Sequence, residues 1–290
     1  MSPELHDRSE GAQPCRFCGS DRSLASTGRV VGDYELFEHD CCGTIGVREE
    51  PSPEELARIY DALFEEGDYH QHRSEVEAIR AGRQVGGRYR RWLLNRVASR
   101  APGRRLVEIG VGSGAFGVMA QSMGWQYSGF DISAVAVDFA RQAGLQATQF
   151  SASGPPNLQP ASADLIVMWE VIEHVWDVCG YLRAVVKALA PGGALLLSTP
   201  NYLREAYQRG DDWGRQMRPP VHLNFFTEQA LRIVLNRRGL QEVRVYKRRL
   251  FSPSPRNLTG VHRSLRLALE IEESPTLYAI AMSKEPIPRQ

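Results

Sequence analysis

The chain has 290 residues, of which 42% are hydrophobic, and its 35 basic residues nearly balance its 34 acidic ones, for a net charge of +1. A chain of this size can bury one full core and a smaller second one, and the balanced charge shows no basic footprint for nucleic acid or a membrane surface. No apolar run reaches the roughly 18–20 residues of a membrane span, and residues 1–13 lack an apolar signal-peptide segment, so a cytoplasmic location is expected.

The N-terminal region predicts a disordered tail over residues 1–13 and a small metal-binding knuckle over residues 14–50. Four of the five cysteines lie within the first 42 residues. An odd number of cysteines in a reducing compartment argues against a disulfide framework. The clustering therefore indicates a metal site.

The spacing of the knuckle residues suggests the ligands of that site. Cys15-x-x-Cys18 forms a first half-site, and the second reads His39-Asp-Cys41-Cys42-Gly, with His39 where a second C-x-x-C pair would begin. We therefore predict a closed, structural zinc site of Cys15, Cys18, His39 and Cys42. Cys41 in place of His39 is the alternative, and it would require two adjacent ligands.

Residues 51–100 are predicted to form a helical lid or linker. Pro51 and Pro53 interrupt the chain after the knuckle, and Ser52-Pro-Glu-Glu is typical of a capped helix start. Apolar residues recur at helical spacing between residues 74 and 98. The segment 68–73 contains a tyrosine, Tyr69, and an arginine, Arg73, just before this helix.

From residue 104 onward, short apolar strands alternate with helices. The expected strands span 106–109, 125–130, 146–150, 165–169, 194–198, 241–246 and 277–282, and the expected helices span 115–123, 133–142, 181–189 and 227–238. Such alternation predicts an α/β fold with a doubly wound parallel sheet covered on both faces. This domain is expected to span residues 101–290, with a polar insertion at 252–274.

The first strand leads into a glycine-rich turn that fits two patterns. A G-x-G-x-x-G motif beginning at Gly112, followed by Asp131 at the end of the next strand, matches a dinucleotide fingerprint. An E-x-G-x-G-x-G motif from Glu108 to Gly114 instead places an acid inside the strand. In this second pattern the turn accommodates an uncharged adenosine and a methionyl carboxylate at a helix N-terminus.

Three later segments favour the second pattern. A buried strand runs into Glu170-Val-Ile-Glu-His-Val, Pro191-Gly-Gly precedes a strand that ends in Ser-Thr-Pro-Asn201, and His222-Leu-Asn-Phe-Phe-Thr-Glu opens a helix. Over roughly residues 55–250 the chain resembles the class I S-adenosylmethionine-dependent methyltransferases, in particular the subgroup with an E-V-x-E-H-V segment. The resemblance implies a Rossmann-like sheet of seven strands with an antiparallel last strand.

The resemblance also implies the residues that hold S-adenosylmethionine. The glycines let the backbone approach the methionyl and ribose parts, and Asp131 accepts the ribose hydroxyls. Relatives often have an aspartate after the third strand for the adenine amine, and here Ser151 or a backbone group would serve. The implied cofactor-binding set is Tyr69, Arg73, Glu108, Gly110, Gly112, Gly114, Asp131, Ile132, Ser151, Met168, Trp169 and Glu170.

A histidine and carboxylate group is expected to do the proton chemistry. A hydroxyl, carbon-acid or protonated amine acceptor needs a base, and histidine suits that role because its ordinary pKa is about 6.5. Glu170, Glu173 and His174 are spaced i, i+3 and i+4, so one helical turn would gather them on the same side. We predict His222 as the base, with His174 second and Glu173 in the same catalytic group.

Two related families suggest different acceptors. In metal-dependent RNA 2′-O-methyltransferases that resemble this subgroup, residues at the positions of Glu170, Glu173, His174 and His222 bind Mg²⁺, although the basic extensions of an RNA enzyme are missing here. In zinc-knuckle sugar C-methyltransferases a Glu-His pair precedes the last helix, whereas this chain has Val221-His222. The sequence predicts a small-molecule acceptor, such as a sugar nucleotide or natural-product intermediate, with no nucleic-acid or membrane partner; the RNA enzyme is the alternative.

Overall fold

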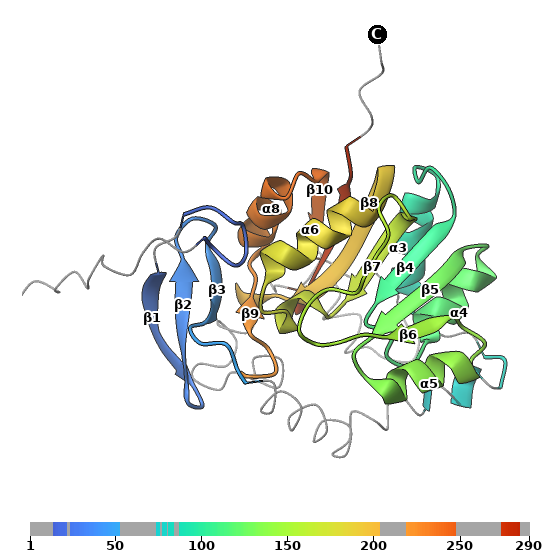
Figure 1. The fold of residues 1–290 in the computed structure, drawn as a ribbon, viewed down its shortest axis with the longest axis horizontal. Helices are drawn as coiled ribbons and strands as arrows, with labels where there is room; N and C mark the ends of the chain where they lie inside the picture. Colours follow the sequence, from blue (N-terminus) through green and yellow to red (C-terminus); the bar gives the residue numbers. More distant parts are fainter. Residues whose placement is uncertain are drawn as a thin grey trace, which may run out of the picture.

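The computed structural model describes residues 14–21, 24–52, 74–75, 77–79, 81–83, 87–203, 219–247 and 274–284. Within them the chain forms a seven-stranded sheet flanked by helices and a four-stranded sheet at its side (Figure 1). The expected tail over residues 1–13, the cofactor candidates Tyr69 and Arg73, and all but the last residue of the 252–274 insertion lie outside the described residues. Among the helices of these ranges, none is both long and apolar enough to cross a membrane.

The large sheet has the strand order β10-β11-β8-β7-β4-β5-β6. Its strands are β4 (Arg105–Ile109), β5 (Gln126–Asp131), β6 (Ala147–Gln149), β7 (Ala163–Trp169), β8 (Leu189–Pro200), β10 (Gln241–Tyr246) and β11 (Thr276–Met282). Strands β4 to β8 pair in parallel, and β11 is antiparallel to both β8 and β10. This confirms the predicted Rossmann-like sheet with an antiparallel last strand. Because the chain moves outward in both directions from β4, ligands are expected at the carboxyl ends of β4 and its neighbours.

Helices cover both faces of this sheet, and each face buries its own apolar core. One face carries α3 (Arg88–Ala98), α4 (Ala115–Ser122) and α5 (Ala134–Gln142), and the other carries α6 (Val178–Ala188) and α8 (Glu228–Arg237). Successive side chains of a strand point to opposite faces of the sheet, so Leu106 packs in the first core and Val107 in the second. Polar N-cap side chains accept backbone N–H groups at the starts of α5, α6 and α8.

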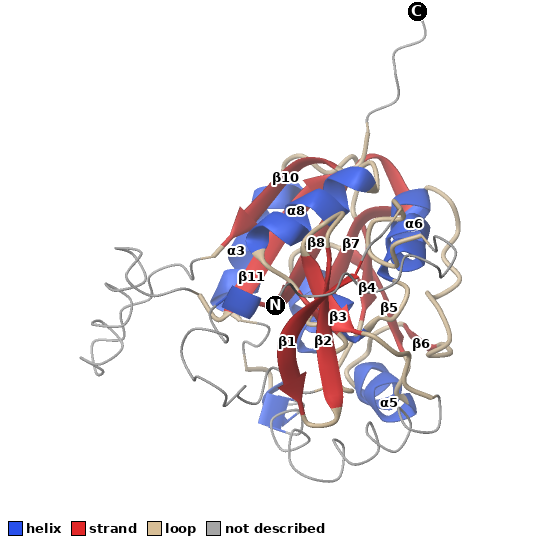
Figure 2. Ribbon diagram, turned by 90° about the vertical axis from the view of Figure 1, so that its left-hand side faces the viewer, coloured by secondary structure: helices blue, strands red, loops and turns tan. Residues whose placement is uncertain are grey.

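The N-terminal region forms the small sheet, which the sequence did not predict. Its strands are β1 (Leu24–Val31), β2 (Tyr34–His39), β3 (Thr44–Val47) and β9 (Asn224–Phe225), all antiparallel. Strand β9 comes from the methyltransferase-like domain and pairs with β3, as the blue and orange strands in Figure 1 show. Figure 2, from the knuckle side, shows β1 to β3 in front of the large sheet.

The knuckle also shares its core with the large domain. Cys15, Phe17, Cys18 and Cys42 are buried and belong to the apolar cluster that α6 and α8 form against the sheet. Apolar residues of the small sheet itself form a separate cluster with Tyr202 and Leu223. The knuckle is therefore packed against segments far away in the sequence.

Candidate active site

The turn after β4 has the backbone geometry of a ligand cradle. Gly110, Gly112 and Gly114 have φ values of 83°, 52° and 77°. Glycine adopts this left-handed region without the penalty of a side chain. A Cβ on Gly110 would also lie 2.6 Å from Val171. Gly114 is the N-cap of α4 and offers no side-chain cap, so the helix presents its first N–H groups to an anionic ligand.

Asp131, at the end of β5, faces this turn. Its Oδ2 accepts a hydrogen bond from the Gly112 N–H at 3.2 Å, and its Oδ1 accepts one from the Ser133 N–H at 2.9 Å. The half-buried Ile132 follows, and Ser151 lies exposed after β6, hydrogen-bonded to the Ser153 hydroxyl at 2.9 Å. Adjacent parallel strands thus bring these predicted residues to one edge of the sheet.

Glu108 lies beneath the turn. Its side chain is 2% exposed, and its Oε2 accepts a hydrogen bond from the Tyr127 hydroxyl at 2.6 Å. Burial raises the pKa of Glu108 to about 8, against the opposing effect of the Tyr127 bond. A carboxyl group in this position supports the glycine turn from inside the core.

The two residues predicted to line the pocket beneath the sulfonium point in opposite directions. Met168 is 0% exposed and packs in the core with α6 and α8, and its place beside the sulfonium stays a prediction. Successive strand residues face opposite sides of a sheet, which turns Trp169 toward the turn side. Trp169 packs edge-on against Phe116, with ring centroids 5.4 Å apart, and the Arg90 guanidinium lies 5.2 Å from its ring.

One described residue of the predicted lid reaches the cofactor turn. The Ser113 hydroxyl, between the second and third glycines of the turn, donates a hydrogen bond to the Glu75 carboxylate. No motif marks Glu75, so sequence reasoning missed it. The contact supports the prediction that the 51–100 segment covers the turn.

The acidic turn after β7 begins with Glu170, whose carboxylate also interacts with the following strand β8. Glu170 has a φ of 53°, an uncommon conformation for a residue with a side chain, and its Oε1 accepts a hydrogen bond from the Ser198 hydroxyl at 2.6 Å. The following residues form a 3₁₀ turn, η1 (Ile172–His174), and not the α-helical turn that the spacing suggested. Glu170 still lies close enough to Glu173 for its charge to raise the pKa of that residue, whereas Glu173, His174 and His222 form the tighter group.

Glu173, His174 and His222 do come together, with ligand atoms within 4.8 Å of one another. Glu173 is 1% exposed, and neither carboxyl oxygen has a hydrogen-bond partner among the described residues. Burial, and secondarily the charge of Glu170, raises the pKa of Glu173 well above its ordinary value. Burial therefore favours the protonated form of this carboxyl group.

The two histidines lie against each other with ring centroids 4.6 Å apart. Nδ1 of His174 lies 2.8 Å from the Val221 carbonyl oxygen and donates its hydrogen to it, which leaves Nε2 as the acceptor. Burial lowers the pKa of His174 to about 3, and the nearby His222 contributes. His174 is thus held as a neutral imidazole in one tautomer.

A strap over residues 221–226 fixes this turn. The Leu223 N–H donates to the Glu173 carbonyl oxygen at 2.8 Å. The Asn224 side-chain amide donates to the carbonyl oxygens of Ile172 at 2.9 Å and Val175 at 2.6 Å. Asn224 is 2% exposed and was not among the predicted residues, because an asparagine inside an apolar run carries no motif.

Four cysteines, Cys15, Cys18, Cys41 and Cys42, form a compact sulfur cluster with no disulfide. Their Sγ–Sγ distances are 3.9 Å for Cys15 and Cys42 and 3.5 Å for Cys18 and Cys41. A tetrahedral zinc site with Zn–S bonds of about 2.3 Å needs sulfurs about 3.8 Å apart. The cluster therefore fits a zinc ion.

Cys41, the alternative to His39 in the predicted ligand set, is the fourth member of this group. The chain turns tightly here, with the N–H groups of Cys42 and Gly43 donating to the His39 carbonyl oxygen at 3.1 and 2.7 Å. That turn lets two adjacent thiols approach one point. His39 lies beside the cluster, with Nδ1 3.4 Å from the Cys15 sulfur and its ring against Phe17.

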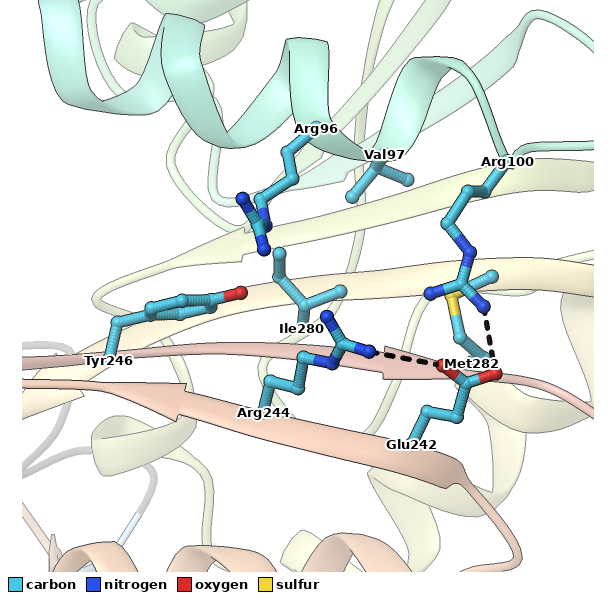
Figure 3. Close-up of a pocket in the computed structure, with 8 residues that line it drawn as sticks. All are labelled: Arg96, Val97, Arg100, Glu242, Arg244, Tyr246, Ile280 and Met282. Atoms are coloured by element: carbon cyan, nitrogen blue, oxygen red, sulfur yellow. Dashed lines mark hydrogen bonds and ion pairs between the residues drawn. The ribbon is translucent and has the colours of Figure 1, made fainter.

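A separate pocket of about 210 Å³ lies between α3, β10 and β11 (Figure 3). Its wall is formed by Arg96, Val97, Arg100, Glu242, Arg244, Tyr246, Ile280 and Met282. Glu242 lies 2.7 Å from Arg100 and 3.7 Å from Arg244, as the dashed lines show. No predicted site residue lines this pocket, so the candidate active site is the edge with the glycine turn.

The strand order, the glycine turn after β4 and the carboxylate at the end of β5 define the class I S-adenosylmethionine-dependent methyltransferase fold. Residues 81–245 match a protein-family model described as "Methyltransferase domain". The chain belongs to this methyltransferase family.

Relatives agree with this assignment. The "Ubiquinone biosynthesis O-methyltransferase" of Xanthomonas campestris pv. campestris is 32% identical over 122 residues, covering 39% of this chain and 51% of the relative. A "Probable S-adenosylmethionine-dependent methyltransferase" of Mycolicibacterium smegmatis is 33% identical over 111 residues, covering 38% and 43%. The chain thus spans about half the length of these curated relatives.

A solved structure shows the same fold. The S-adenosylmethionine-dependent methyltransferase of Mesorhizobium loti superposes with a TM-score of 0.50 at 22% identity. The match covers 68% of this chain and 98% of the other. At this identity the similarity is one of fold.

Proposed function

We propose that the protein transfers a methyl group from S-adenosylmethionine to a hydroxyl of a small-molecule acceptor, with His222 as the general base. The observation that carries the proposal is the position of the Glu173, His174 and His222 group. It follows β7, the strand next to β4, and the preceding Val171 contacts the position of Gly110 in the cofactor turn. Methyl donor and proton acceptor would therefore meet at one edge of the sheet.

The residues of the turn fit the cofactor. The uncapped N-terminus of α4 provides N–H groups for the methionyl carboxylate, and Asp131 is oriented for the ribose hydroxyls. When bound, S-adenosylmethionine supplies a methyl group on a positively charged sulfur. The chain's part is to align the acceptor with that group and to exclude water, which lowers the barrier by positioning.

The histidine geometry favours His222 over His174 as the base. His174 is a poor proton acceptor because burial lowers its pKa to about 3, and its Nδ1–H is committed to the Val221 carbonyl oxygen. Its fixed ring contacts His222 and orients it. The proton of the acceptor hydroxyl would pass to His222 as its oxygen attacks the methyl carbon.

The acceptor class follows from two features. Val221 replaces the glutamate that precedes the histidine in the sugar C-methyltransferases, which disfavours carbon-acid chemistry. The Xanthomonas relatives are named O-methyltransferases of ubiquinone biosynthesis, which supports a hydroxyl acceptor. A phenol, a sugar nucleotide or another natural-product intermediate satisfies both.

The sulfur cluster is proposed to hold a structural zinc ion. Four thiolates leave no open position for chemistry, and the sulfur distances match a tetrahedral site. Arg237 donates to the Cys18 sulfur at 3.2 Å and offsets part of the negative charge of such a site.

A second candidate function is metal-dependent 2′-O-methylation of RNA. It is favoured by the closeness of Glu173, His174 and His222, three of its four predicted ligands. The fourth, Glu170, acts on the pKa of Glu173 by its charge and accepts a hydrogen bond from Ser198. Methyl transfer to an RNA oligonucleotide that requires Mg²⁺ or Mn²⁺ would support this candidate.

The test is transfer of a labelled methyl group from S-adenosylmethionine to a panel of phenols, catechols, sugar nucleotides and RNA, with and without EDTA. We expect EDTA-resistant labelling of a small hydroxyl acceptor, which Asp131→Ala abolishes. Asp138→Ala is the control, because Asp138 is an exposed aspartate of α5. Among the described residues its ion pair is a long one, 3.9 Å to Arg141. Labelling of RNA alone, dependent on added metal, would contradict the first proposal.

A further inference from the structure

Arg16 lies inside the knuckle, between Cys15 and Cys18, yet its side chain points into the methyltransferase domain. It is 8% exposed. Its Nη1 donates to the Trp176 carbonyl oxygen at 2.9 Å and to Asn224 Oδ1 at 2.7 Å. Its Nη2 donates to the carbonyl oxygens of Val47 and Leu223, both at 3.3 Å. One guanidinium therefore joins three separate segments of the chain.

The rings of two aromatic residues pack against this guanidinium and restrict its orientation. The ring centroids of Phe17 and Trp176 lie 4.3 and 4.0 Å from its central carbon. Strand β3 approaches so closely that a Cβ on Gly46 would clash with Nη2 of Arg16. A buried charge that is stacked and hydrogen-bonded in this way has one orientation available to it.

Asn224 carries the contact from Arg16 to the acidic turn. Its Oδ1 accepts from Arg16, and its amide nitrogen donates to the carbonyl oxygens of Ile172 and Val175, which bracket Glu173 and His174. Leu223, which Arg16 also contacts, donates its N–H to the Glu173 carbonyl oxygen. The Asn224 amide and the Arg16 guanidinium thus contact the backbone on both sides of the Glu173–His174 pair and the residue that follows His222.

The sulfur cluster holds the backbone at Arg16, where this series of contacts begins. Cys15 and Cys18 flank Arg16 and Phe17, so a metal bound by these thiols would fix the backbone from which Arg16 extends. Arg238 of the segment after α8 donates to the Cys18 carbonyl oxygen and to the Cys179 sulfur, which ties the same loop to the large domain.

We propose that Arg16 and Asn224 are positioning residues through which the cysteine knuckle sets the orientation of His174 and His222. The effect of this positioning on catalysis rests on the proposed function, but the histidine geometry can be measured without any acceptor. Loss of metal from the knuckle would then change the orientation of the two histidines through Arg16 and Asn224.

The test compares Arg16→Lys with Arg48→Lys in the zinc-loaded full chain. Lysine keeps the charge but cannot donate to four acceptors in one plane. Arg48 is a matched control because it is an exposed arginine of the same domain, 5.3 Å above the Phe37 ring. The readouts are zinc content, S-adenosylhomocysteine affinity, and the pH titration of the histidine Cε1–H signals by NMR.

In Arg16→Lys we expect zinc and S-adenosylhomocysteine affinity to stay within about twofold, while the His174 signal titrates at a higher pH than in wild type. With an acceptor in hand, kcat should fall about tenfold or more at unchanged cofactor KM, with a shifted pH profile. Histidine titrations identical to those of Arg48→Lys would overturn the proposal. Shifted titrations without any methyl transfer would leave it standing and count against the proposed function alone.

Asn224→Ser provides a second variant if Arg16→Lys does not fold. It removes the amide that holds the Ile172 and Val175 carbonyl groups and leaves every knuckle residue intact. We expect the same shift of the His174 titration at full zinc content. An unchanged titration in this variant would contradict the proposal.

Discussion

The two halves of the candidate site are built in different ways. The cofactor half is local, because β4, the glycine turn, α4 and Asp131 follow one another along the chain. Its shape is set mainly by the backbone conformation of the glycines. The histidine half is assembled from the knuckle, η1 and the 221–226 strap, which are far apart in the sequence. The first half depends on glycine geometry, whereas the second depends on buried polar contacts.

This difference predicts that the two halves can be damaged separately. A backbone cradle tolerates changes elsewhere as long as its glycines and strand ends stay in place. A relay of buried hydrogen bonds fails when one partner is removed, because the remaining groups are left without partners. Variants of the histidine half should therefore spare cofactor binding, and variants of the cofactor half should spare the knuckle.

The largest effect is expected from Cys41→Ser. Removing one thiolate of the sulfur cluster should lower zinc from about one equivalent to less than half and destabilise the fold by several kcal/mol, since structural zinc supplies folding energy. His39→Asn, beside the cluster, should keep its zinc. Metal analysis and thermal unfolding provide the measurement. Zinc retained in Cys41→Ser but lost in His39→Asn would restore His39 as the fourth ligand.

His222→Ala should come next, with a kcat lower by about 100-fold or more, as expected for loss of a general base. Affinity for S-adenosylhomocysteine should stay within about twofold, because the predicted cofactor ligands are Asp131 and the glycine turn. Steady-state kinetics and calorimetry measure the two effects. Full turnover in the variant would remove His222 from the mechanism.

Asp131→Ala probes the cofactor half. Loss of hydrogen bonds from a charged acceptor costs about 1.5–3 kcal/mol, so the Kd for S-adenosylhomocysteine should rise about 10–100-fold. Zinc content should not change. If Asp138→Ala weakens binding equally in calorimetry, the assignment of the ribose contact to Asp131 fails.

The smallest effect is expected from Glu173→Gln in the ligand-free protein. The pKa of Glu173 is raised above its ordinary 4.5, so the folded state opposes ionisation and loses stability as pH rises above that value. A neutral glutamine escapes this penalty. The variant should therefore be more stable than wild type at pH 7, and the gap should close near pH 4. Urea unfolding at both pH values measures it; an equal gap at both would exclude ionisation as the cause.

The sequence predicted the cofactor half better than the histidine half for physical reasons. Strand and helix periodicity located the elements of the large sheet, and the glycine motif marked a turn whose φ values only glycine adopts easily. The side on which a strand residue points depends on register, so the sequence did not show which of the two cores Met168 and Trp169 join. Periodicity also does not distinguish a 3₁₀ turn from an α-helical one, so the form of the turn that carries Glu173 and His174 was not predicted.

The knuckle was recognisable only by its cysteines. Strand β1 has the sequence Leu-Ala-Ser-Thr-Gly-Arg-Val-Val, without the alternation that marks a half-buried strand, and β9 has two residues. The choice between His39 and Cys41 depends on a turn that the spacing did not reveal. Arg16 and Asn224 gain their importance only from segments that meet in three dimensions.

The most direct test of the account is a crystal structure of the zinc-loaded full chain with S-adenosylhomocysteine. The account predicts the ribose on Asp131, the carboxylate at the N-terminus of α4, and the sulfur facing the space beside Glu173, His174 and His222. Binding elsewhere, such as between Arg96 and Arg244, or a sulfur turned away from both histidines would contradict it.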